Sequence, residues 1–198
     1  IFFQLLPGSF AAAPLVLGGP GTTDGTFSVA AADLDGGGAQ DLVSANLAGN
    51  NLSVFFHLSP GSLAAAPLTL GGAGTTSRPF SVTAADLDED GDMDIVSSKG
   101  GNRILGEGAN LTVFFQAPPG TFADTPLTLG SFFLGFPVSV AAADLDGDGD
   151  QDLVSANEDS NDLTVFFQSP PGSFASTPLT LGNSLTMDGP ESVAAADL

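Results

Sequence analysis

The sequence predicts an all-β fold in which short strands assemble into repeated four-stranded antiparallel sheets. Three observations support this class. A unit of about 53 residues recurs along the 198-residue chain. No run places apolar residues at helical spacing, and 26 glycines with 14 prolines would interrupt helices repeatedly.

The four strands of a unit are clearest in the first complete copy. The expected strands cover residues 27–32, 41–44, 52–56 and 67–71, and clusters of Gly, Pro, Asn and Ser separate them. Successive side chains of a strand point to opposite faces, so Leu52 and Val54 share one face while Phe55 lies on the other. The third strand is therefore apolar on both faces and requires a partner on each.

Side-chain size rises from the alanine-rich first strand to the phenylalanines of the third. A sheet with this gradient forms a wedge that narrows toward a central axis, and stacking on copies of itself covers both of its faces. We therefore predict β-propeller blades of four antiparallel strands, about three full blades with partial blades at both ends. The predicted units are residues 1–27 (the C-terminal part of a preceding blade), 28–80, 81–138, 139–191 and 192–198 (the start of a further blade). Because both ends fall inside a unit, we expect a segment of a larger propeller or repeat array.

An acidic loop follows the first strand of each unit. In the loop that begins at Asp144, acidic side chains occupy positions 1, 3, 5, 7 and 9, and glycine occupies position 6. Carboxylates on alternate residues of a tight turn converge on one point, and the glycine permits the positive φ that wraps the loop around a hard cation. Calcium is the predicted cation, and its predicted ligands are Asp33, Asp35, Asp41, Asp86, Asp88, Asp90, Asp92, Asp94, Asp144, Asp146, Asp148, Asp150, Asp152 and Asp197.

The first acidic loop departs from the pattern. Gly37 replaces the position-5 aspartate, so we expect this loop to bind calcium more weakly than the second and third. For every loop the alternative is that the acids are solvated turn residues, because Asp and Gly are common turn formers.

The run from Ser139 to Asn157, SVAAADLDGDGDQDLVSAN, resembles the FG-GAP or VCBS repeat of integrin-alpha-type β-propellers. The resemblance extends in register over nearly the whole chain. It implies a propeller of seven or sometimes six blades, with a calcium loop between the first and second strands of each blade. Three full units and about thirty further residues are too few for such a ring.

Composition narrows the function further. The net charge is −20, from 23 acidic and 3 basic residues, and the loops hold three, six, five and one of the acids in chain order. Nucleic acid is excluded as a partner because phosphate binding needs lysine and arginine. Because the chain has no cysteine, bound calcium must provide the stabilising cross-links that disulfides give other extracellular domains. Loops of three or four carboxylates suit the near-millimolar calcium outside cells, where weak sites still fill. No apolar run approaches the roughly 18 residues that span a membrane, and two N-glycosylation sequons lie at Asn51 and Asn110.

Catalysis has little support in the sequence. His57 is the only histidine, and other units carry glutamine at its place. No Ser-His-Asp set can be assembled, and the clustered carboxylates are already explained as metal ligands. We expect no enzymatic activity; an isolated Asp or Glu acting as an acid is the alternative.

Two segments break the repeat. The insertion at 99–108 contains Arg103, and the connection at 131–137 contains Phe132, Phe133 and Phe136. In an up-and-down blade both segments emerge on the face opposite the calcium loops, so these four residues are the predicted partner-binding residues. The alternative is that the phenylalanines fill a local gap.

These features predict an extracellular or cell-surface module that calcium stabilises and that acts in adhesion, recognition or cell-surface structure. Its expected partners are a protein or glycan ligand, or copies of itself. Two alternatives are a segment of an extracellular structural fibre and an accessory propeller of a polysaccharide-degrading enzyme.

Overall fold

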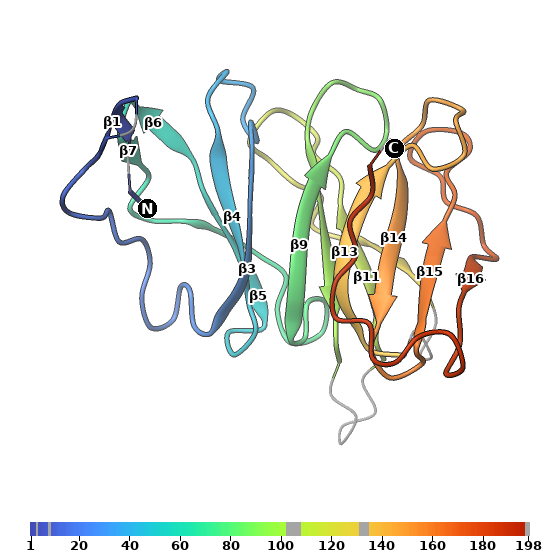
Figure 1. The fold of residues 1–198 in the computed structure, drawn as a ribbon. Helices are drawn as coiled ribbons and strands as arrows, with labels where there is room; N and C mark the ends of the chain where they lie inside the picture. Colours follow the sequence, from blue (N-terminus) through green and yellow to red (C-terminus); the bar gives the residue numbers. More distant parts are fainter. Residues whose placement is uncertain (3, 8, 102–107, 131–134, 197–198) are drawn as a thin grey trace.

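The computed structural model describes residues 1–2, 4–7, 9–101, 108–130 and 135–196. Over this part of the chain the structure is all-β, without helices, and three four-stranded antiparallel sheets follow one another (Figure 1). The predicted fold class of repeated four-stranded blades is confirmed. The described residues form consecutive blades and not a closed ring. They contain no helix of the length and hydropathy needed to cross a membrane.

Each sheet has its strands in chain order. The first sheet consists of β3 (Thr26–Ala32), β4 (Asp41–Asn46), β5 (Asn51–Phe55) and β8 (Leu68–Leu70). The second consists of β9 (Pro79–Ala85), β10 (Asp94–Lys99), β11 (Asn110–Phe114) and β12 (Leu127–Leu129). The third consists of β13 (Pro137–Ala143), β14 (Asp152–Asn157), β15 (Asp162–Phe166) and β16 (Leu179–Leu181). These bounds lie within two residues of the strands predicted for the first complete unit.

The second sheet is covered on both faces. Ile95 of β10 packs into the core shared with the first sheet, whereas its neighbour Val96 packs into the core shared with the third, and both are fully buried. Phe114 and Val113 of β11 divide between the two cores in the same way. Alternating side chains thus bury both faces, as the doubly apolar third strand requires.

The first strands β3, β9 and β13 pack side by side on the inner edge of the blades (Figure 1). Alanines and serines in these strands permit the close approach. A serine hydroxyl in each strand accepts the N–H of a valine one unit later, in the pairs Ser28–Val82 (3.3 Å), Ser81–Val140 (3.3 Å) and Ser139–Val193 (3.2 Å). The same contact therefore joins each unit to the next.

A small hairpin between the third and fourth strands was not predicted. In the first unit it is formed by β6 (His57–Ser59) and β7 (Ser62–Leu63), with Gly61 at the tip. In the later units the equivalent hairpins are closed by single antiparallel bridges, Gln116–Phe122 and Gln168–Phe174. The chain begins with an equivalent pair, β1 (Gln4–Leu6) and β2 (Ser9–Phe10).

Candidate metal sites

The acidic loops connect the first and second strands of each sheet and lie together at one end of the molecule, the upper end in Figure 1. In each loop the structure brings three carboxylates together, with ligand oxygens within 4.8 Å of one another. The three sets are Asp33, Asp35 and Asp41; Asp86, Asp88 and Asp90; and Asp144, Asp146 and Asp152. The other predicted ligands Asp92, Asp94, Asp148 and Asp150 belong to the same loops but not to these sets, and Asp197 lies outside the described residues.

The loops share one backbone design. The position-6 glycine donates its N–H to Oδ2 of the position-1 aspartate, in the pairs Gly38–Asp33 (2.7 Å), Gly91–Asp86 (3.1 Å) and Gly149–Asp144 (3.1 Å). These glycines have φ of 80°, 94° and 102°, which L side chains rarely adopt. Glycine at position 6 therefore closes the turn that gathers the carboxylates.

The position-9 aspartates have a role that the sequence did not reveal. Asp94 is fully buried, and its two oxygens accept the N–H groups of Leu87 (2.9 Å) and Gln116 (2.7 Å). Asp41 and Asp152 make the equivalent bonds, so this residue ties its loop to the end of the third strand. Burial raises the pKa of Asp94 to about 7, and the two amide hydrogen bonds oppose that rise. A nearby cation would favour the charged form.

Two buried carboxylate oxygens fit a cation directly. Oδ1 of Asp33 and Oδ1 of Asp86 are buried and have no hydrogen-bond partner. Buried polar atoms are rarely left without a partner, because desolvation is costly. Desolvation also raises the pKa of Asp88, and the charge of Asp90 adds to the rise. The donor set is all oxygen and all anionic, which is the chemistry that calcium prefers.

A family model for the FG-GAP-like repeat matches residues 33–97, 104–155 and 144–198, which together cover most of the chain. The chain belongs to the FG-GAP-like repeat family. Repeats of this family often bind calcium and are typical of extracellular proteins. The comparison with curated protein sequences returns no match.

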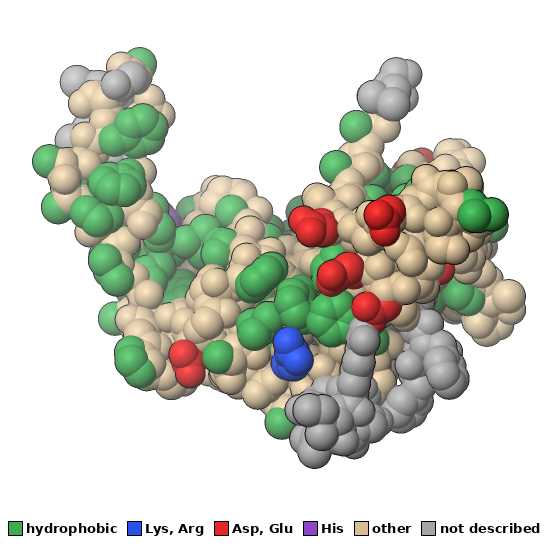
Figure 2. Space-filling model, turned by 60° about the horizontal axis from the view of Figure 1, so that its bottom comes forward, with side chains coloured by type: hydrophobic (Ala, Val, Ile, Leu, Met, Phe, Trp, Pro, Cys, Tyr) green, Lys and Arg blue, Asp and Glu red, His purple; other side chains and the backbone are tan. Residues whose placement is uncertain are grey.

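The end of the FG-GAP-like units opposite the acidic loops carries an aromatic row, which we define as Phe27, Phe80 and Phe136. Their rings meet edge to face, with centroids 5.1 Å apart for Phe27–Phe80 and 5.0 Å apart for Phe80–Phe136. Arg78 places its guanidinium carbon 5.8 Å from the centre of the Phe80 ring. Figure 2 shows hydrophobic side chains gathered beside a basic side chain on this face.

Only part of the predicted partner-binding set can be placed. Phe136 is half-buried, whereas Arg103, Phe132 and Phe133 lie outside the described residues. The sequence prediction missed Phe27, which is 64% exposed, together with its neighbours Phe80 and Arg78. The sequence did contain a signal for this row, because phenylalanine is the second residue of both β3 and β9.

The two glycosylation sequons lie at the starts of β5 and β11. Asn51 and Asn110 are half-buried, and the hydroxyl residues of the same sequons, Ser53 and Thr112, are buried. Asn51 Oδ1 also accepts a hydrogen bond from Asn46 Nδ2 at 2.8 Å. Glycosylation at these two sites stays a prediction.

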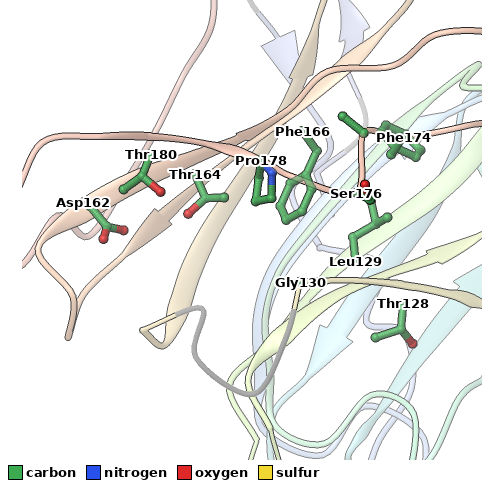
Figure 3. A pocket seen from close by; sticks show the side chains of 11 residues that line it. Thr128, Leu129, Gly130, Asp162, Thr164, Phe166, Phe174, Ser176, Pro178 and Thr180 are labelled. Atoms are coloured by element: carbon green, nitrogen blue, oxygen red, sulfur yellow. The ribbon is translucent and has the colours of Figure 1, made fainter.

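A pocket of about 500 Å³ lies between β12 and the outer strands β15 and β16 (Figure 3). Asp162 is the single ionisable residue among its described lining residues. Its Oδ1 already accepts hydrogen bonds from Asn157 Nδ2 (2.7 Å) and Ser160 Oγ (2.8 Å). The pocket thus offers no acid and base pair within the described part of the chain.

Proposed function

We propose that this chain is an extracellular β-propeller module that calcium stabilises and that serves adhesion, recognition or cell-surface structure without catalysis. The observation that carries the proposal is the buried, unpartnered oxygen of Asp33 and of Asp86 inside a cluster of carboxylates. Bound calcium would supply the positive charge that these clusters lack. Extracellular calcium is near millimolar, so sites of modest affinity fill there.

The absence of catalysis is part of the proposal. Its support is that the clustered carboxylates have a structural explanation in the loops. His57, the sole histidine, donates its backbone N–H to Asp41 Oδ1 at 2.6 Å, as the glutamines of later units do with Asp94 and Asp152. His57 therefore occupies a structural position at the start of the hairpin strand β6. The pocket beside Asp162 adds no second titratable group among its described residues.

Recognition is proposed for the aromatic row and Arg78, at the end opposite the acidic loops. Phe27 is largely exposed, and aromatic residues with arginine often dominate binding energy at interfaces. A protein or a glycan is the proposed ligand class, because each offers apolar surface and hydrogen-bonding groups to such a patch.

Thermal melting tests the calcium part. Metal that binds only the folded state stabilises it by about 2.7 kcal/mol per site at 100 times the Kd. Each filled site should therefore raise the Tm in calcium above that in chelator by on the order of 5–10 °C. Asp146→Ala, in the third loop, should lose part of this gain. Asp124→Ala, which removes an exposed acid outside the loops, should keep all of it. Identical melting curves in calcium and in chelator would refute the proposal.

A further inference from the structure

The hairpin of each later unit reaches back onto the acidic loop of the unit before it. Gly172, at the tip of the hairpin between Gln168 and Phe174, donates its N–H to the carbonyl oxygen of Leu87 in the second loop at 2.8 Å. The same N–H lies 3.1 Å from Gln168 Oε1. A Cβ added to Gly172 would lie 3.1 Å from Cβ of Asp88, so the glycine permits the approach.

The preceding hairpin, between Gln116 and Phe122, also lies close to the first loop. A Cβ built on Gly120 would be 3.5 Å from Cβ of Asp35. A Cβ built on Gly36 would be 3.7 Å from Cβ of Pro119. The contact between loop and following hairpin therefore occurs at both places where the described residues include both partners.

Coverage by the hairpin changes the burial of the loop. The position-2 leucines Leu34 and Leu87, in the covered loops, are 0% exposed. Leu145, at the same position of the third loop, is 39% exposed, and no hairpin of the described residues lies on that loop. The hairpin of the following unit thus seals the loop beneath it.

Each loop that a hairpin covers also keeps one buried carboxylate oxygen free for a cation. Oδ1 of Asp33 and of Asp86 is buried and unpartnered in the covered loops. In the third loop Asp144 is exposed, and its Oδ1 accepts the N–H of Gly147 at 2.7 Å. A ligand oxygen that is already free and fixed costs less to engage than one that must first give up a hydrogen bond.

Each hairpin is in turn tied to its own loop. The N–H of Gln116, where the second hairpin begins, donates to Asp94, and the N–H of Gln168 donates to Asp152. A continuous path of contacts therefore runs from the first loop through the second to the third, in alternation with the hairpins.

We propose that the hairpin of the following unit completes each calcium site, so that calcium binding to a loop and docking of the next unit favour each other. The inference rests on the proposed calcium binding. Coupling of this kind is reciprocal: the hairpin raises the calcium affinity of the loop, and calcium holds the hairpin in place. The second and third loops carry aspartate at the same five positions, and the second loop also holds Glu89. If the hairpin completes the site, the covered second loop binds calcium more tightly than the third, and a change in the hairpin alone reduces that difference.

A calcium titration of the ¹⁵N-labelled 198-residue chain, followed by NMR, tests the coupling. The amides of Gly91 and Gly149 bond directly to the position-1 aspartates and report the second and third loops separately. Coupling of this kind typically changes an affinity about 5-fold or more. The signal of Gly91 should therefore reach its midpoint at about 5-fold lower calcium than the signal of Gly149. Gly172→Ala should shift the Gly91 midpoint to higher calcium and so reduce that difference.

Gly61→Ala is the matched control. Gly61 is the equivalent tip glycine of the first hairpin, with φ of 78° against 76° for Gly172, and a Cβ there would meet nothing within 4 Å. It imposes the same backbone strain without a loop contact. A midpoint for Gly91 that is the same in both variants would overturn the coupling.

Hydrogen exchange of the unmodified chain gives a second test that needs no variant. Calcium should slow exchange of the Gly172 amide at least about 5-fold and leave the Gly61 amide unchanged. An unchanged rate at Gly172 in protein whose loops bind calcium would overturn the coupling and leave the proposed function standing. Failure of every loop to respond to calcium would overturn both.

Discussion

Two kinds of aspartate occupy the second acidic loop, although the sequence pattern treats them alike. Asp94 is fully buried with both oxygens bonded to backbone amides, whereas Asp88 is half-buried and lies in the carboxylate cluster. The spacing of the acids predicts that their carboxylates converge, but it does not show which of them accept hydrogen bonds from backbone amides. That distinction depends on where the third strand ends, since the N–H of Gln116 comes from a residue distant in sequence.

Asparagine variants should separate the two kinds. Asp94→Asn replaces one acceptor with a donor that faces a backbone N–H, so it should destabilise the protein by about 1–3 kcal/mol even in chelator. Asp88→Asn should be neutral or slightly stabilising in chelator, because it relieves repulsion from Asp90, and should reduce the gain from calcium. Urea denaturation in both conditions measures these changes. Equal losses for both variants in chelator would contradict the assignment.

One strand end breaks a hydrogen-bond pattern that its counterparts share. Asn46, at the end of β4, donates from Nδ2 to Asn51 Oδ1 (2.8 Å) and Ser53 Oγ (2.9 Å). Asn157, at the end of β14, makes the equivalent pair of bonds. The second sheet has Lys99 there, which is 8% exposed and donates to the carbonyl oxygen of Gly74 at 3.1 Å.

Lys99→Asn should therefore be more stable than a variant that removes the lysine without adding a donor. Asn110 Oδ1 is buried without a partner beside Lys99, and an asparagine amide would donate to it as Asn46 does to Asn51. One restored hydrogen bond is worth about 1 kcal/mol. Lys99→Met, which removes the charge without adding a donor, is the control in urea denaturation. The explanation is wrong if the asparagine variant is no more stable than the methionine variant.

The strands were predictable from sequence, whereas the hairpins were not. Strands such as β5 combine alternating apolar residues with flanking Gly and Asn, which marks them within two residues. The hairpin strand β7 is two residues long, too short to show an alternating pattern. The Pro-Gly pair in each unit predicts a turn, but no pattern within one unit shows that Gly172 meets a loop of the preceding unit.

The whole molecule has two chemically different ends. The acidic loops gather most of the negative charge at one end, and their position there follows from the strand order alone. The aromatic row lies at the other end, because Phe27 and Phe80 are near the starts of the same first strands whose ends lead into the loops. The proposed metal sites and the proposed recognition surface are thereby separated in space, so a variant at one end should leave the other intact.

Phe27→Ala should weaken partner binding without altering the calcium-dependent rise in Tm. Truncating an exposed aromatic anchor typically costs on the order of 1–3 kcal/mol of binding energy. Phe10→Ala is the matched control, since Phe10 is 61% exposed against 64% for Phe27 but lies on β2 at the loop end (Figure 1). Binding to a panel of immobilised glycans and extracellular proteins measures the effect on any ligand found. Equal losses for the two variants would show that exposed aromatic surface in general, and not the aromatic row, makes the contact.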